Sequence, residues 1–248
     1  MKTFRWINYP KEASFISRHN RFTAIVKDKS FEKLVYLPDP GRLEELLIPN
    51  ANVIIEKRRE TGKTYHDLLL VETVSFLDKR LLMVSVDSRL PNILFRWLIE
   101  EELINHFGKI KQIKSEPKVD NGRLDYYIES TTGKHYIELK SVNLIDASGT
   151  ARFPDAPTKR GTKHLNELMN LKNQGYNCWI FFIVVRSDAI TFSPFFERDP
   201  LFSKTLKKAQ KAGINIRALK FEVDSEIKFL KEIPVNLNQN PFAGYWPE

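Results

Sequence analysis

The sequence contains a single cysteine, Cys178, among its 248 residues. One thiol cannot form an internal disulfide and cannot supply the several thiolates of a cysteine-bound metal cluster. Long apolar runs are also missing. The longest, residues 178–185 (CWIFFIVV), has eight residues, whereas a membrane-spanning helix needs about 20. The first ten residues, MKTFRWINYP, lack the apolar core of a signal peptide. We therefore expect a soluble cytoplasmic protein that does not enter membranes.

Disorder of the whole chain is excluded by composition, because 42% of the residues are hydrophobic and 28% are charged. The formal net charge is +8, and both halves of the chain contribute to it. Six basic residues follow one another without an intervening acid: Lys204, Lys207, Lys208, Lys211, Arg217 and Lys220. They are either the solvated face of a helix followed by a strand, or a surface that attracts the phosphate backbone of a nucleic acid.

Strand signals dominate residues 1–87. Runs rich in β-branched, aromatic or leucine residues, separated by turn formers, cover residues 22–26, 33–37, 52–57, 68–74 and 81–86. A short amphipathic segment, residues 42–47 (RLEELL), is predicted to form one or two helical turns. Five short strands and a small helix predict a small closed β-barrel such as an OB-fold.

The periodicity changes near residues 87–92 (DSRLPN), and we take residues 88–235 as a second domain. Helices are predicted at residues 92–106, 161–173 and 202–212, and strands at residues 113–119, 123–129, 135–142, 178–185 and, last, 214–222. This order predicts a mixed sheet with helices on its faces, so that the fold class is α/β (α+β). Residues 236–248 are polar and rich in turn formers, and we expect a loose C-terminal tail.

The most informative stretch, residues 122–141 (GRLDYYIESTTGKHYIELKS), places three charged residues on two neighbouring strands. Side chains alternate along a strand, so Glu138 and Lys140 share one face. If residues 130–133 form a four-residue turn, Glu129 pairs with Lys134 and Asp125 lies opposite Glu138. A slip of one residue in the register would separate the two carboxylates.

Two facing carboxylates favour a hard divalent cation such as Mg²⁺ or Mn²⁺, and the backbone carbonyl of Leu139 is a candidate third ligand. Such an ion polarises a phosphate and activates a bound water, while Lys140 can hold that water or stabilise transition-state charge. Hydrolysis of a phosphodiester suits this set of residues. The alternative is a solvated sheet face, but the apolar neighbours of Glu138 and Lys140 predict partial burial, and a buried charge needs a partner or a metal.

A second stretch, residues 151–165 (ARFPDAPTKRGTKHL), indicates a family. Together with the Asp125 strand, the IELK segment of residues 137–140 and PDPGRLEELL of residues 38–47, it resembles the sugar fermentation stimulation protein A family. The similarity covers residues 15–221, and a run as long as FPDAPTKRGTKHL is very specific.

This resemblance implies a DNA-binding protein with an N-terminal OB-like barrel and a second domain similar to PD-(D/E)XK nucleases. The catalytic residues of those nucleases would correspond to Asp125, Glu138 and Lys140. They often use a further acid, for which Glu116, Glu101 and Glu102 are the candidates. The acids that the family carries on its first helix are displaced here, because residues 90–97 read LPNILFRW.

The loop before the second predicted helix is interpreted as a phosphate-binding segment. The N–H groups at the start of a helix favour an anion, and Lys159, Arg160 and Lys163 add positive charge around Gly161. The alternative is a rigid connection with Asp155 as a cap. His164 is either a general base or, as is more common for a histidine beside leucines, structural.

In the barrel, basic residues beside aromatic residues are the pattern that single-stranded nucleic acid binding requires. The candidates are Arg18, Arg21, Lys57 and Arg58. The same composition is also normal at the ends of β-hairpins.

Two functions follow from these patterns. The first is a metal-dependent nuclease that grips single- or double-stranded DNA with the barrel and cuts it at Asp125, Glu138 and Lys140. The second is a DNA-binding transcriptional regulator that retains a nuclease fold without catalysis, since a fold does not determine a function. The intact trio favours the enzyme, because a regulator has no chemical need for it.

Overall fold

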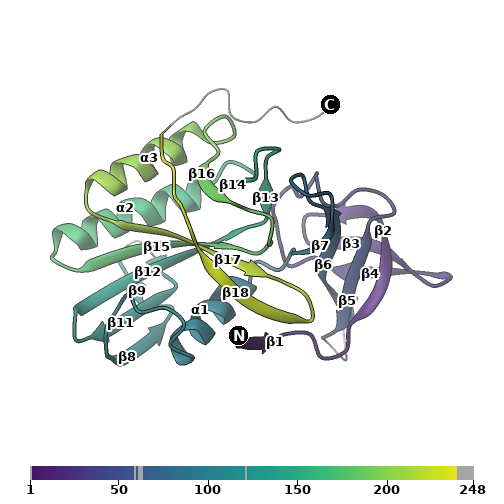
Figure 1. The fold of residues 1–248 in the computed structure, drawn as a ribbon, viewed down its shortest axis with the longest axis horizontal. Coiled ribbons are helices and arrows are strands. Elements are labelled where there is room, and N and C mark those ends of the chain that lie inside the picture. The colour runs from purple at the N-terminus through teal and green to yellow at the C-terminus, as the bar shows by residue number, and fades with distance from the viewer. Residues whose placement is uncertain (1, 59, 61–63, 121, 239–248) are drawn as a thin grey trace.

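The computed structural model describes residues 2–58, 60, 64–120 and 122–238. The N-terminal part of the chain forms a small β-barrel, and the remainder forms a larger layered domain beside it (Figure 1). Among the described residues, no helix is both long and apolar enough to cross a membrane.

The barrel is built from β2 (Lys11–Asn20), β3 (Thr23–Asp28), β4 (Phe31–Tyr36), β5 (Asn52–Lys57), β6 (His66–Val74) and β7 (Leu81–Ser85). Its strands are ordered β4-β3-β2-β5-β6-β7. A parallel contact between Tyr36 and Asp67 joins β4 to β6 and closes five strands into a ring, which β7 extends. Buried side chains such as Phe15, Val26 and Val53 fill the interior. The predicted OB-like barrel is confirmed.

Two local features of the barrel differ from the sequence prediction. The sequence does not predict strand β2 (KEASFISRHN), because its apolar residues do not alternate regularly with its polar and charged residues. Residues 42–47, predicted to form one or two helical turns, form a single hydrogen-bonded turn, in which the N–H of Leu47 donates to the carbonyl of Leu43 at 2.8 Å. Leu43 has a φ of 54°, a left-handed conformation that cannot continue a right-handed helix. Leu43 and Leu46 instead pack into the barrel core.

The larger domain is organised around a seven-stranded mixed sheet. In spatial order its strands are β1 (Thr3–Arg5), β18 (Glu226–Ile233), β17 (Asn215–Glu222), β15 (Asn177–Val184), β12 (Gly133–Val142), β11 (Tyr126–Ser130) and β8 (Ile110–Ser115). The central strands β12, β15 and β17 are parallel, and the outer pairs are antiparallel. The mixed α/β architecture is as predicted, although the N-terminal strand β1 joins this sheet and not the barrel.

Helices cover both faces of the sheet because the central strand β15 is apolar on both sides. Trp179, Phe181 and Ile183 pack toward α1 (Leu90–Glu100). The alternate residues of the same strand pack toward α2 (Lys159–Asn173) and α3 (Pro200–Lys211), which lie next to each other (Figure 1). This alternation places Glu138 and Lys140 on the α2 side of β12, since Ile137 and Leu139 belong to the α1 side.

Short strands flank the sheet and divide two of the predicted strands. Strands β9 (Lys118–Val119) and β10 (Gly122–Arg123) form a small hairpin, so residues 113–119 and 123–129 are not continuous strands. The chain leaves the sheet at Glu116, whose φ is 50°. A separate small sheet contains β13 (Leu144–Ile145), β14 (Thr150–Phe153) and β16 (Thr191–Pro194).

The end of α1, the number of strands after residue 214 and the C-terminal segment differ from the prediction. Helix α1 ends at Glu100 and not at residue 106, because Glu102 takes a φ of 54°. The strand ending at residue 222 is followed by a further strand, β18, which pairs with it. The expected tail lies largely outside the described residues, but Leu237 is buried and the N–H of Asn236 donates to the carbonyl of Phe192 at 2.8 Å.

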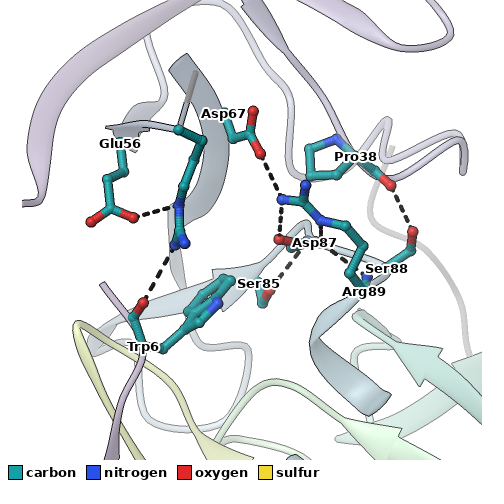
Figure 2. A network of polar contacts seen from close by, with 9 residues as sticks. Trp6, Pro38, Glu56, Asp67, Ser85, Asp87, Ser88 and Arg89 are labelled. Carbon is teal, nitrogen blue, oxygen red and sulfur yellow. Dashed lines mark hydrogen bonds and ion pairs between the residues drawn. The ribbon is translucent and has the colours of Figure 1, made fainter. Parts of the chain in front are cut away.

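The barrel and the larger domain are joined by a polar network around Arg89 (Figure 2). The Arg89 guanidinium contacts Asp67 of β6 at 2.7 Å and Asp87 at 2.6 Å, and both carboxylates are buried. The Ser88 hydroxyl donates to the carbonyl of Pro38 at 2.6 Å. Apolar residues of the barrel, including Leu69, pack in the same cluster as α1. The start of α1 is therefore held against the barrel.

Replacing Arg89 with alanine should destabilise the protein by about 2–3 kcal/mol, because the change removes the cation that two buried carboxylates face. The free energy of unfolding, measured with urea, checks this expectation. The matched control is Arg96→Ala, which removes an exposed ion pair with Glu100 on the same helix and should cost about 0.5 kcal/mol or less. Equal losses in the two variants would contradict the role given to Arg89.

Candidate functional site

The register of the β11–β12 hairpin brings the predicted carboxylates together. Glu129 pairs with Lys134 and Ser130 with Gly133, as predicted from a four-residue turn. The regular pairing ends with Tyr126 opposite Ile137, and the next bond is shifted by one residue, because the N–H of Asp125 donates to the carbonyl of Ile137 at 3.1 Å. Asp125 is nevertheless near Glu138, whose negative charge acts on it, although the two are not a regular strand pair.

The Asp125 carboxylate is held at the end of β11 by two donors. Its Oδ2 accepts the backbone N–H of Leu139 at 2.7 Å, and its Oδ1 accepts the side-chain amide of Asn92 at 3.3 Å. Burial, followed by repulsion from Glu138, raises the pKa of Asp125 to about 6. The carboxylate thus lies in a position where its negative charge is unfavourable in the protein alone.

Glu138 is 2% exposed, and its two carboxylate oxygens have different surroundings. Its Oε1 contacts both the Lys140 ammonium and Nδ1 of His164, whereas its Oε2 is buried without a hydrogen-bond partner in the described structure. Burial raises the pKa of Glu138, but the adjacent Lys140 and His164 outweigh that effect and lower it overall. Glu138 is therefore an ionised carboxylate with one available oxygen.

These residues lie in a cleft of about 630 Å³ between the barrel and the larger domain. The barrel loop around Pro40 forms one wall, and the segment that precedes α2 forms another. Five acids and five cations line the cleft: Asp39, Glu116, Asp125, Glu138 and Asp155, and Arg21, Arg89, Lys140, Arg152 and Arg160. The cleft walls are therefore balanced in formal charge.

The predicted phosphate-binding segment is only partly in this cleft. Arg160 lines it, whereas Lys159 and Lys163 are exposed outside it. The N–H of Gly161 donates to the Thr158 hydroxyl at 2.9 Å, so the first turn of α2 is already capped. A side chain at Gly161 would also collide with Thr158 and approach Phe202 of α3 at 3.1 Å. Gly161 thus permits close helix packing.

Asp155 does not cap α2, contrary to the alternative interpretation. Its Oδ2 accepts the N–H of Arg42 from the barrel at 2.7 Å. On the other side, Asp39 of the barrel accepts the side-chain amide of Asn143 at 3.1 Å. Burial, together with repulsion from Asp155, raises the pKa of Asp39 to about 6. Two reciprocal contacts therefore hold the barrel loop against the wall that carries β12.

The four predicted basic residues of the barrel are dispersed. Arg21 is exposed, lines the cleft and lies 5.6 Å from the centre of the Phe22 ring. Arg18 donates to backbone carbonyls, including those of Gly41 at 2.5 Å and Arg42 at 2.7 Å, and supports the barrel loop. Lys57 and Arg58 do not line the cleft, and they form ion pairs with Glu60 and Glu56.

Of the three candidates for a further acidic metal ligand, only Glu116 lies at the cleft. Glu116 lies at the cleft and its carboxylate pairs with Arg123 at 2.9 Å. Glu101 and Glu102 follow the C-terminal end of α1, whereas Pro91 and Asn92 at its other end line the cleft. An eleven-residue helix is about 16 Å long, so neither acid reaches Asp125.

Sequence reasoning overlooked the contributions of Asn92, Asp39 and Arg89 to the cleft. In the sequence these residues lie in or beside the segments LPN (residues 90–92) and PDPG (residues 38–41), whose composition indicates turns. A turn pattern does not show which distant residues the segment contacts. The sequence pattern indicates no partner for His164, whereas in the structure its Nδ1 contacts Oε1 of Glu138.

The donor set fits a hard divalent cation. Two carboxylates face each other, and the unpartnered Oε2 of Glu138 is buried beside them. Among the residues that the structure describes, no group of three or more His, Cys, Asp or Glu side chains is arranged to hold a metal ion. A cation here would take its other ligands from backbone carbonyls and water, which is common for Mg²⁺.

Family models match both parts of the chain. The model described as the SfsA N-terminal OB domain matches residues 16–78, and that described as the sugar fermentation stimulation protein RE domain matches residues 89–227. The chain belongs to the sugar fermentation stimulation protein (SfsA) family. The larger domain is accordingly a nuclease-like mixed-sheet domain.

Individual relatives cover nearly the whole chain. The sugar fermentation stimulation protein homolog of Desulforamulus reducens is 39% identical over 227 residues, covering 91% of this chain and 92% of the relative. The homolog of Clostridium tetani is 37% identical, covering 92% and 97%. The solved structure of Pyrococcus furiosus SfsA in complex with Ca²⁺ has a TM-score of 0.85 and 32% identity, covering 93% of this chain and 97% of that one.

Asp125→Asn should stabilise the metal-free protein at pH 7.5. Folding raises the pKa of the Asp125 carboxyl from 3.8 to about 6, so the folded state holds this proton more tightly than the unfolded state. The free energy of unfolding therefore falls as the pH rises from about 4 to 6, and the loss persists above that range. The variant should gain on the order of 2 kcal/mol at pH 7.5 and little near pH 4. Urea unfolding of both proteins in the presence of a chelator, at pH 7.5 and near pH 4, measures the difference in the free energy of unfolding.

The control for that measurement is Asp120→Asn, which changes an exposed carboxylate outside the cleft and should alter stability at neither pH. A loss of stability in Asp125→Asn at pH 7.5 would identify Asp125 as a structural ion-pair partner instead.

Proposed function

We propose that this chain is a DNA-binding protein and a divalent-metal-dependent nuclease that hydrolyses phosphodiester bonds at Asp125, Glu138 and Lys140. The observation that carries the proposal is the unpartnered, buried Oε2 of Glu138 beside the Asp125 carboxylate. Such an arrangement is unfavourable without a cation and favourable with one.

The proposed cation is Mg²⁺ or Mn²⁺. Asp125 and Glu138 would hold it, with the backbone carbonyl of Leu139 as a third ligand and Glu116 at the cleft as a further candidate. The Ca²⁺ in the structure of the Pyrococcus furiosus relative supports a divalent ion with oxygen ligands. When bound, the ion would polarise the phosphate and lower the pKa of a coordinated water.

The protein's own groups prepare the site. Asn92 and the N–H of Leu139 orient the Asp125 carboxylate. Lys140, whose side chain is 13% exposed, lines the cleft beside Glu138 and can hold the attacking water or stabilise negative charge on the phosphate. Because Lys140 is a compact ammonium, it can do so close to the two carboxylates.

DNA would enter the cleft between the OB-like barrel, whose strands lie within residues 11–85, and the nuclease-like domain, which follows from residue 88 and also includes β1. Arg21 and Arg160 line the cleft from opposite sides of this junction, and Lys159, Gly161 and Lys163 lie at the adjacent start of α2. The proposed DNA contacts do not include Lys57 and Arg58, which form ion pairs with Glu60 and Glu56, or Arg18, which donates to backbone carbonyls.

A second candidate function is a non-catalytic DNA-binding regulator that retains the nuclease fold. The observation in its favour is Asn92, because a neutral amide contacts Asp125 where a further carboxylate would complete a cluster of three acids. Both candidates share DNA binding and differ in turnover.

His164→Ala should weaken the binding of Mn²⁺ by about 10- to 100-fold, because His164 contacts Oε1 of Glu138 and leaves Oε2 available. His164→Asn retains a donor near the position of Nδ1 and should bind the ion more tightly than the alanine variant. Calorimetric titration with Mn²⁺ gives both affinities, and equal weakening in the two variants would indicate a general packing role.

Lys140→Ala should slow the cleavage of single- or double-stranded DNA by about 100-fold or more and should change DNA affinity little. Lys140→Arg keeps the charge and DNA affinity but should also lose activity, since a guanidinium is larger than an ammonium. Single-turnover cleavage with Mg²⁺ or Mn²⁺, set against chelator, measures the rates, and fluorescence anisotropy measures binding.

The matched control for Lys140 is Lys134→Ala, which changes an exposed lysine on the same strand and should leave cleavage unaltered. If the wild-type protein binds DNA but cleaves no nucleic acid with either metal, the regulator is the correct function.

A further inference from the structure

The excess positive charge of the protein is concentrated on two helices. Helices α2 and α3 contain eight basic residues and one acid, a net charge of +7, whereas the whole chain has a net charge of +8. The acid, Glu167, is 4% exposed. The rest of the chain is therefore close to neutral.

The two helices begin together beside the cleft. Asp199, the N-cap of α3, accepts the N–H of Phe202 at 2.9 Å and also that of Thr158, the N-cap of α2, at 2.8 Å. Arg160 in the first turn of α2 lines the cleft. From this shared start the helices lie side by side across one face of the sheet (Figure 1).

The cations of these helices are directed outward because the apolar residues face the sheet. In α3 the residues Phe202, Leu206 and Ala209 are buried, while Lys204, Lys208 and Lys211 are exposed. We define the α2–α3 face by the cations of both helices: Lys159, Arg160, Lys163, Lys172, Lys204, Lys207, Lys208 and Lys211. Arg217 is not part of it, because it lies over the Trp179 ring toward α1.

These cations differ from those of the barrel in their partners. Within the described part of the chain, none of the eight forms an ion pair with an acid. An exposed acid, Glu197, lines a small cavity together with Lys204 and Lys207. Many cations of the barrel and its junction are paired: Lys11 and Lys33 with Asp28, Lys57 with Glu60, Arg58 with Glu56, and Arg89 with Asp67 and Asp87.

Without a bound ion, the side chains of the cleft supply little net attraction for a polyanion, because its five acids match its five cations. Nucleic acid binding without sequence preference depends on unpaired cations that replace the counterions of the phosphates. The α2–α3 face carries such cations and borders the cleft.

We infer that the α2–α3 face, and not the barrel, is the main electrostatic contact of this protein for the phosphate backbone of DNA that extends out of the cleft. This inference rests on the proposed DNA binding. The 15 residues of α2 span about 22 Å, which corresponds to about six base pairs of a duplex. Bound DNA would therefore be longer than the segment in the cleft.

The test is the affinity for a labelled duplex of about 20 base pairs, measured by anisotropy at several salt concentrations between about 50 and 200 mM. The variant is Lys204→Gln, Lys207→Gln, Lys208→Gln and Lys211→Gln combined in the full chain. Glutamine and lysine have similar helix propensities, so α3 should persist, as circular dichroism can verify. The variant should bind about tenfold more weakly or worse and lose about two to four units of salt slope.

A matched variant separates location from net charge. Lys109, Lys111, Lys114 and Lys118 are exposed on and beside β8, and changing all four to glutamine alters the net charge by the same amount. This control should bind within about threefold of the wild type. A second variant, Lys159→Gln with Lys163→Gln, tests the α2 part of the face and should weaken binding by a smaller factor.

Each outcome decides between the proposals. If the wild type binds DNA and the α3 variant binds as tightly, or if the α3 and β8 variants weaken equally, the α2–α3 face is not the contact and DNA binding itself stands. If the wild type binds no DNA at low salt, the proposed function fails and this inference fails with it. Shortening the duplex by about six base pairs should weaken the wild type and leave the α3 variant almost unchanged.

Discussion

The register of the β11–β12 hairpin is the constraint on which the site depends. Thr131 and Thr132 form its two-residue loop, so Ser130 pairs with Gly133 and each later pair is determined. Asp125 then reaches the N–H of Leu139, and the adjacent residue Glu138 faces α2. Gly133 has a φ of 120° and a side chain there would meet Asn177 at 2.9 Å, so this loop requires glycine. A slip of one residue would turn Glu138 toward the apolar cluster of α1.

The junction with the barrel converts this hairpin into a cleft. Asp39 and Asp155 each accept a donor from the opposite domain, and Arg89 binds Asp67 of the barrel at the start of the helix that carries Asn92. Arg89, which binds the barrel, and Asn92, which binds Asp125, are only three residues apart at the start of α1.

Burial gives the two kinds of charged group in this protein different roles. Acids in the cleft are desolvated, so Asp125 and Asp39 both have a pKa raised to about 6, and a cation at Asp125 would relieve part of that cost. The cations of α2 and α3 are exposed or half-buried, and none of them forms an ion pair with an acid among the described residues. Under the proposed function, a divalent ion would neutralise the acids of the cleft, and the phosphates of DNA would neutralise the cations of the neighbouring helices α2 and α3.

The sequence alone determined the local features. Alternation along residues 135–142 and a turn at residues 130–133 predicted that Asp125 faces Glu138, and a run of apolar residues predicted the central strand β15. The tertiary structure decided which cations are available: Arg58 and Arg18 are taken up by a carboxylate and by backbone carbonyls, and residues 42–47 turn into the barrel core. Periodicity and turns arise from neighbours in the chain, and so one sequence contains them. Ion pairing and the walls of the cleft arise between segments far apart in the chain, and only the packed fold brings them together.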